Sequence, residues 1–205
     1  MWVVKLGGSL WRGGWLAPWC RLLADLPGPL LIVPGGGFFA DRVRAAQGRE
    51  GFPDVTAHHL ALKAMDSMAA LLCRLEPRLQ RARRLHGQGP GRMASHRVWM
   101  PSMELAGDTS VAADWSVTSD SLAALAARRT GALGLVVVKS ASLVGRPAEA
   151  ARLAAAGVVD AAFPVLAADC GCPVWLLHRS QGGALAGLAR GGPDHGLRLR
   201  FFEPP

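Results

Sequence analysis

The residues best suited to chemistry lie near the start of the chain, in the run Lys5-Leu6-Gly7-Gly8-Ser9. This run follows the short apolar stretch at residues 2–4, which has the character of a buried strand. Glycines directly after a strand let the backbone approach a ligand closely, so that N–H groups can point at phosphate oxygens. Lys5 is the candidate catalytic cation, because it would hold an ammonium over the same oxygens. The candidate phosphate- or nucleotide-binding residues are Gly7, Gly8 and Ser9.

A second glycine turn, Gly35-Gly36-Gly37, follows the apolar run at residues 30–33. Two such turns indicate two anionic groups held facing each other, as phosphoryl transfer requires. That reaction asks a protein mainly for positioning and for positive charge beside the transferred group, and an anionic acceptor needs no general base. Neither a Walker P-loop nor a G-x-G-x-x-G motif is present. We therefore expect Gly35, Gly36 and Gly37 to bind the substrate.

A third segment whose side chains could take part in catalysis or binding, residues 114–122, leads into a predicted helix. Thr118 and Ser119 can cap the N-terminus of this helix, which is itself an anion site, and we assign both to substrate binding. Asp120 is the second candidate catalytic residue and is expected to orient Lys5. An acidic residue at a helix start also has a purely structural explanation, because it interacts favourably with the helix dipole.

Two further candidates have equally plausible structural explanations. His58, near the start of a predicted helix, is expected to contact the substrate, although a helical histidine is commonly an ordinary packed residue. Lys139 ends the apolar run at residues 133–138 and is expected to bind nucleotide phosphates, although a strand-end lysine is commonly solvated. The pair Cys170 and Cys172 lacks the second pair that a tetrahedral metal site needs, so no metal site is expected.

Apolar runs of strand length alternate with amphipathic stretches along the chain. Strands are predicted at 2–6, 30–33, 98–101, 134–139 and 173–177, with a final edge strand at 197–202. Helices are predicted at 15–26, 38–47, 55–75, from the 114–122 run to about 129, 147–156, 161–169 and 183–190, with 74–97 irregular. Asp54 and Asp160 are expected to cap two of these helices. The alternation predicts an α/β fold with a mainly parallel sheet covered on both faces, in one domain spanning 1–205, with ligands beyond the carboxyl ends of the strands.

The overall composition indicates which kinds of binding partner to expect. The formal net charge is +8, but no basic patch with interleaved aromatics is present, so we expect a small phosphate substrate and no nucleic acid. No unbroken apolar run is long enough for a membrane span, and the first strand leaves no room for a signal peptide, so we expect a cytoplasmic protein with reduced thiols. The apolar stripe of the 55–75 helix indicates a homo-oligomer, a dimer or larger, unless it only fills the core.

Several of these motifs resemble the signature loops of the amino acid kinase family. They are Val4-Lys5-Leu6-Gly7-Gly8-Ser9, Pro34-Gly35-Gly36-Gly37 and Thr118-Ser119-Asp120-Ser121. The runs at 58–66 and 114–122, and Asp160 with Phe163-Pro164, are most similar to the branch that phosphorylates aminomethylfuran-methyl phosphate in methanofuran biosynthesis. The resemblance implies a three-layer αβα sandwich, ATP with nucleotide-carried Mg²⁺, and transfer of a phosphoryl group onto the acceptor phosphate.

The chain departs from that family pattern in the half expected to bind the nucleotide. After the fourth strand it reads Lys139-Ser140-Ala141-Ser142 where the family commonly has Val-Asp-Gly. The segment 165–169 lacks a second lysine that would stabilise the transferring phosphoryl, and Lys139 is the candidate substitute. Two alternatives therefore remain open: a catalytically impaired kinase-fold partner subunit, and a kinase of another small acid or a nucleoside monophosphate.

Overall fold

The computed structural model describes residues 1–85, 95–145, 148–190 and 196–201. Its centre is a seven-stranded sheet in the order β3-β4-β2-β1-β5-β6-β7. All neighbouring strands run parallel except β7, which pairs antiparallel with β6 at the sheet edge. The strands are β1 (Trp2–Leu6), β2 (Leu30–Pro34), β3 (Gln80–Ala82), β4 (Arg97–Trp99), β5 (Gly134–Lys139), β6 (Val174–His178) and β7 (Leu197–Arg198).

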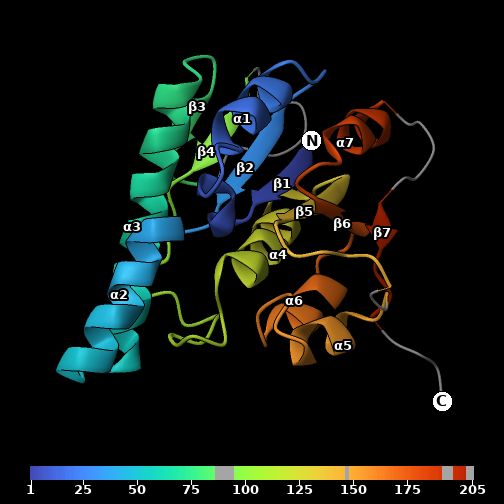
Figure 1. Ribbon diagram of the computed structural model, residues 1–205. Helices are drawn as coiled ribbons and strands as arrows, with labels where there is room; N and C mark the ends of the chain where they lie inside the picture. The colour runs from blue at the N-terminus through green and yellow to red at the C-terminus, as the bar shows by residue number, and fades with distance from the viewer. Residues whose placement is uncertain (86–94, 146–147, 191–195, 202–205) are drawn as a thin grey trace.

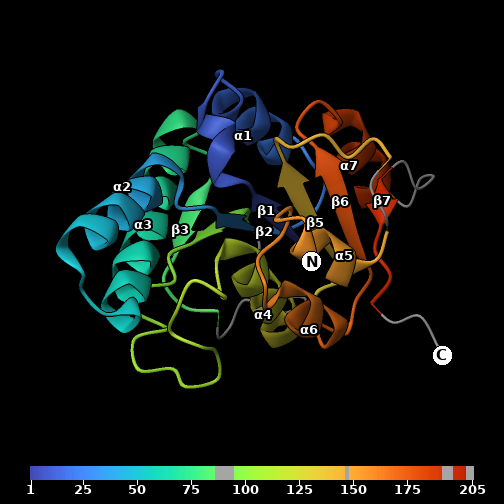
Figure 2. The same ribbon diagram turned by 60° about the horizontal axis from the view of Figure 1, so that its bottom comes forward.

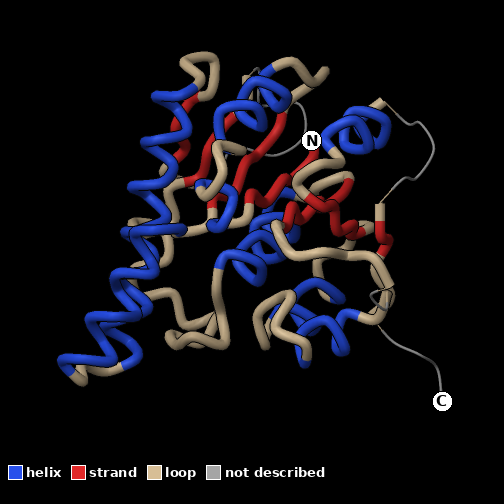
Figure 3. The backbone as a smooth tube through the Cα atoms, in the orientation of Figure 1, coloured by secondary structure: helices blue, strands red, loops and turns tan. Residues whose placement is uncertain are grey.

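Helices cover both faces of this sheet (Figures 1 and 3). They are the 3₁₀ helix η1 (Gly8–Trp11) and α1 (Leu16–Ala24), α2 (Gly37–Glu50), α3 (Asp54–Leu75), α4 (Ser119–Thr130), α5 (Ala150–Ala155), α6 (Phe163–Ala168) and α7 (Gly182–Ala189). Figure 2 shows α1 and α7 on one side and α4, α5 and α6 on the other. The structure thus confirms the predicted α/β architecture with a mainly parallel sheet.

The central strands are buried on both faces, which explains their continuous apolar sequences. Alternate residues of each strand point to opposite sides. Val3 and Val137 belong to the core that includes α4, α5 and α6, whereas Val4 and Val136 belong to the core that includes α1 and α7. This alternation fixes which strand-end side chains can reach α4.

Helix α3 lies at one side of the molecule and contributes to both cores (Figure 1). Of the predicted apolar stripe, Met65, Met68 and Leu72 fill the cores, whereas Leu60, Leu71 and also Leu75 are exposed on the outward side. Among the described residues, no helix combines the length and the apolar character needed to cross a membrane.

Some boundaries differ from the sequence-based prediction. β3 forms inside the 74–97 segment that was expected to be irregular, of which 86–94 lie outside the described residues. The final strand is shorter than 197–202 and ends at Arg198, while residue 202 lies outside the described residues. Asp54 is not a cap: Pro53 holds that position and Asp54 is the first helical residue. Asp160 is not a cap of α6 either, because that helix begins three residues later.

Candidate active site

The candidate site lies where the carboxyl ends of β1 and β5 meet, in the middle of the sheet. These strands are neighbours, with Lys5 in register with Val137 and Leu6 with Val138. Lys139 therefore ends β5 two residues beyond the partner of Lys5, on the same face of the sheet. Both lysines consequently point toward the face covered by α4.

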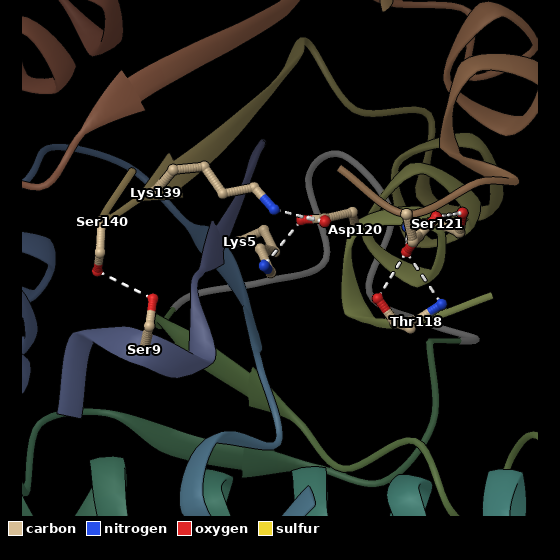
Figure 4. A network of polar contacts seen from close by, with 8 residues as sticks. Lys5, Ser9, Thr118, Asp120, Ser121, Lys139 and Ser140 are labelled. Atoms are coloured by element: carbon tan, nitrogen blue, oxygen red, sulfur yellow. Dashed lines mark hydrogen bonds and ion pairs between the residues drawn. The ribbon is translucent and has the colours of Figure 1, made fainter. Parts of the chain in front are cut away.

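Asp120, in the first turn of α4, forms ion pairs with both Lys5 and Lys139 (Figure 4). Its Oδ1 lies 2.8 Å from the Lys5 ammonium, and its Oδ2 accepts a 2.5 Å hydrogen bond from the Lys139 ammonium. The side chains of Lys5 and Asp120 are 4% and 5% exposed, and that of Lys139 is 13% exposed. The structure thus joins the two predicted catalytic residues, and it places the Lys139 side chain in the same cluster rather than in solvent.

Electrostatics explains how three charged groups share this buried position. Burial alone raises the pKa of Asp120, but Lys139 and Lys5 outweigh it and hold the pKa at about 2. Burial lowers the pKa of Lys139 to about 8, against the opposing attraction of Asp120. With both ammonium groups charged, the buried cluster carries one net positive charge, which suits the binding of an anion.

The start of α4 is held by a carboxylate from a distant segment. Asp160 accepts hydrogen bonds from the backbone N–H of Thr118 at 2.9 Å, the Thr118 hydroxyl at 2.7 Å and the backbone N–H of Ser121 at 3.1 Å. The Ser121 hydroxyl donates to the same carboxylate. Asp160 therefore caps α4 rather than α6, and Thr118 makes no side-chain cap of its own. This cap fixes the first turn that carries Asp120.

The two glycine turns pack directly on each other, which accounts for most of their glycines. A Cβ atom on Gly8 would lie 2.6 Å from the backbone nitrogen of Gly37, and one on Gly35 would lie 2.4 Å from that of Gly8. The Gly7 N–H donates to Val138 O at 3.0 Å, and the Gly35 N–H donates to Leu6 O at 2.8 Å. The expectation that the Gly7 amide binds phosphate is therefore wrong, because its hydrogen bond is made within the sheet.

A cavity of about 290 Å³ opens beside these turns and gathers most of the predicted substrate residues. The N-termini of α2 and α4 both border it, which favours an anion there. Its lining comprises Gly8, Ser9, Arg12, Gly35, Gly36, Gly37, Ala40, Asp41, Arg44, His58, Ala61, Leu62, Met65, Trp115, Val117, Thr118, Ser119 and Leu122.

The polar wall of this cavity includes residues that the sequence alone did not single out. Arg12 lies at its edge and pairs with Asp41 at 3.2 Å. The Arg44 guanidinium lies 4.2 Å from the centre of the Trp115 ring, and the Trp115 indole N–H donates to Gln47 at 2.6 Å. The only sequence signal for them was the Trp115 run, since arginines are frequent throughout the chain.

His58 lines the same cavity from α3. Its Nδ1 lies 3.4 Å from the backbone oxygen of Asp114, which ties α3 to the loop before α4. Burial lowers the pKa of His58, so the ring is neutral at pH 7. A neutral imidazole in this position can exchange hydrogen bonds with a ligand but adds no charge.

A second cavity, of about 610 Å³, lies beyond the carboxyl ends of β5 and β6. It is lined by Ser142, Leu143, Val144, His178, Ser180, Gln181, Gly196 and Leu197. The Ser9 hydroxyl donates to Ser140 at 2.9 Å, so the loop after β1 meets the loop after β5 between the two cavities (Figure 4). The sheet order therefore places the Lys5–Asp120–Lys139 cluster between a cavity at β1 and β2 and a cavity at β5 and β6.

Comparison with solved structures identifies this architecture. The uridylate kinase of Archaeoglobus fulgidus matches with a TM-score of 0.68 and 13% identity, covering 93% of this chain and 96% of that one. UMP kinase from Bacillus anthracis matches with a TM-score of 0.64 and 16% identity, covering 97% of this chain and 98% of that one. UMP kinase from Ureaplasma parvum matches with a TM-score of 0.63 and 13% identity, covering 94% of this chain and 96% of that one. The chain has the amino acid kinase fold. No protein-family model matches its sequence, and no curated protein sequence does.

The carboxylates nearest the centre of this kinase fold already have partners. Asp120 is neutralised by two ammonium groups, and Asp160 accepts the hydrogen bonds that cap α4. Among the described residues, no group of three or more His, Cys, Asp or Glu side chains could hold a metal ion. The two ammonium groups that contact Asp120 are donors suited to an anion such as a phosphate.

Proposed function

We propose that this protein is an ATP-dependent kinase that transfers a phosphoryl group to the phosphate of a small acceptor. The observation that carries the proposal is the buried Asp120 carboxylate holding Lys5 and Lys139 between two cavities. A phosphoryl group moving between two anions needs positive charge at the midpoint of its path, and two preorganised ammonium groups supply it.

In this proposal each part of the site has one task. The acceptor phosphate binds in the 290 Å³ cavity, at the N-termini of α2 and α4 and beside the amides of Gly8 and Gly36. ATP binds on the side of the second cavity, at the ends of β5 and β6. Mg²⁺ carried by the nucleotide would supply further positive charge to its phosphates. Lys5 and Lys139 stabilise the charge of the transferred group, and Asp120 holds both in position.

For the acceptor we propose aminomethylfuran-methyl phosphate, in the biosynthesis of a methanofuran-type cofactor. The support is the resemblance of the segments 58–66 and 114–122, both of which line the acceptor cavity. The lining of the cavity also includes apolar side chains, those of Leu62, Met65 and Val117, in addition to its arginines. A small phosphate ester with a flat ring would contact both kinds of side chain.

A nucleoside monophosphate is the second candidate, because the three solved structures named above are uridylate or UMP kinases. The test presents the purified protein with γ-labelled ATP and either aminomethylfuran-methyl phosphate or UMP. Labelled diphosphate from the furan alone supports the proposal, and labelled UDP alone supports the second candidate. No transfer to either, by a protein that still binds ATP, would favour the partner-subunit alternative raised by the lysine-free segment 165–169.

We also propose that the protein acts in the cytoplasm as a homodimer. The exposed leucines of α3, at positions 60, 71 and 75, have the spacing of residues on one side of a helix, and burying them against a second copy removes apolar surface from water. Because α3 also carries His58, an interface on its outer side would help to fix the position of the acceptor site.

A further inference from the structure

Away from the kinase site, the turn between α6 and β6 brings two thiols together. Cys170 and Cys172 flank Gly171, whose φ of +73° reverses the chain within one residue. Their sulfur atoms lie 3.6 Å apart, and the Cys170 thiol also donates to the backbone oxygen of Cys172 at 3.3 Å. Glycine adopts this backbone conformation without strain, so the close approach of the sulfurs is part of the native turn.

We propose that Cys170 and Cys172 form a reversible dithiol–disulfide couple. A disulfide has a sulfur–sulfur distance of about 2.05 Å, so the two atoms need to approach by only about 1.5 Å from their 3.6 Å separation. The two cysteines are separated by a single glycine at a position with open space beside its Cα, so no neighbouring segment among the described residues packs against Gly171. A neighbouring ion pair between Arg128 and Asp169 holds the preceding residue against α4 while the turn adjusts.

The two sulfurs differ in access and in acidity, as an exchange reaction requires. Cys172 is half-buried and is the accessible member, whereas Cys170 is 4% exposed. A hydrogen bond from the Cys172 thiol lowers the pKa of Cys170 to about 7, and the same contact raises the pKa of Cys172, so the first negative charge of the pair lies on Cys170. The other two cysteines are protected: burial raises the pKa of Cys20 to about 12 and also raises that of Cys73.

The reaction partner is a low-molecular-weight disulfide of the glutathione class. The accessible Cys172 sulfur attacks it while its proton passes to the Cys170 thiolate 3.6 Å away, which forms a mixed disulfide and releases one thiolate. The Cys170 thiolate then attacks the Cys172 sulfur, which forms the internal disulfide and releases the second thiolate. The two protons lost by the cysteines end on the two released thiols, and the two electrons lost by the protein reduce the external disulfide.

The experiment equilibrates the folded protein in buffers of reduced and oxidised glutathione, quenches with acid, alkylates under denaturing conditions and measures intact mass. In reducing buffer all four cysteines should be alkylated. In oxidising buffer two alkylations should be lost without any glutathione adduct, peptide mapping should assign the loss to Cys170 and Cys172, and dithiothreitol should restore both. Cys20 and Cys73 serve as controls within the same molecule.

Two variants separate the internal disulfide from simple thiol modification. Cys170→Ser removes the resolving thiol, so a glutathione adduct should accumulate on Cys172. Cys172→Ser removes the accessible thiol, so the loss of two alkylations should disappear. The proposal is overturned if the wild-type protein keeps all four thiols in the most oxidising buffer, retains a stable glutathione adduct, or loses thiols at Cys20 or Cys73. None of these readouts depends on ATP or on phosphoryl transfer.

Discussion

Replacing Lys5 by methionine tests whether the transferred phosphoryl passes over the lysine cluster. Methionine keeps the buried stem of the side chain and removes only the ammonium, which lies 2.8 Å from Asp120. Asp120 remains paired with Lys139 at 2.5 Å, so the substitution leaves no buried carboxylate without a partner. The cluster changes from one net positive charge to none.

The expected magnitudes differ for turnover and stability. Removing one preorganised donor of charge from a transition state typically lowers turnover ~100- to 1000-fold, which corresponds to about 3–4 kcal/mol. The stability of Lys5→Met should change much less, because the buried stem and one ion pair remain. Asp120→Asn should behave in the opposite way, because it leaves two buried ammonium groups without an anion, at a cost of about 3–5 kcal/mol. For a chain of this length that lowers the Tm by on the order of 10 °C.

The assay is single-turnover transfer from labelled ATP at saturating nucleotide, with thermal melting of each variant as the stability control. At saturating ATP the nucleotide phosphates replace the missing anion in Asp120→Asn, so this variant should lose less turnover than Lys5→Met. Lys63→Met, on the exposed side of α3, is the matched control and should change neither quantity. If Lys5→Met transfers at the wild-type rate, the phosphoryl group does not pass over Lys5, and the partner-subunit alternative becomes the better account.

Three further predictions follow from the same geometry. Since the pKa of Lys139 is lowered to about 8, Lys139 loses its positive charge above pH 8. In that range kcat/KM for ATP should therefore fall about tenfold per pH unit. Lys139→Arg stays protonated and should abolish this fall. Asp160→Ala should lower the free energy of unfolding by about 2–3 kcal/mol, because the first N–H groups of α4 lose a charged acceptor. Urea denaturation measures this change, and an unchanged unfolding midpoint would contradict the role of Asp160 as a cap. Light scattering should show a dimer at micromolar concentration that Leu71→Glu dissociates, and a wild-type monomer would refute the interface on α3.

Most of the fold could be predicted from the sequence because the central strands are buried on both faces. Such strands read as short continuous apolar runs, and five of them were identified from that feature alone. β3 was missed because two of its three residues, Gln80 and Arg81, are exposed and polar at the edge of the sheet. Edge strands carry little apolar signal, and this one lies next to a segment rich in arginine.

The candidate site was predictable only in part, since a sequence gives residue types without the pairing of distant segments. Lys5 and Asp120 could be proposed as partners because each has a local motif. The cap from Asp160 could not, because its partners Thr118 and Ser121 are some forty positions away and an aspartate before a helix has a simpler local explanation. The packing of Gly8 against Gly35 was hidden for the same reason, so the sequence alone indicated no structural requirement for these glycines beside their proposed role in binding a ligand.

The position of Lys139 follows from strand register, which also answers how a chain without a lysine in 165–169 can supply a second cation. β1 and β5 are parallel neighbours, and residues that are paired across them point to the same face. Lys5 pairs with Val137, so a side chain two residues later on β5 must share that face and lie closer to the carboxyl edge of the sheet. A lysine has the length to return from there to Asp120, and its ammonium does so at 2.5 Å. If Lys139 instead served only to balance the charge of Asp120, Lys139→Met would leave single-turnover transfer intact, whereas a role in transfer requires it to fall. In both cases the Tm should change little, because Asp120 stays paired with Lys5.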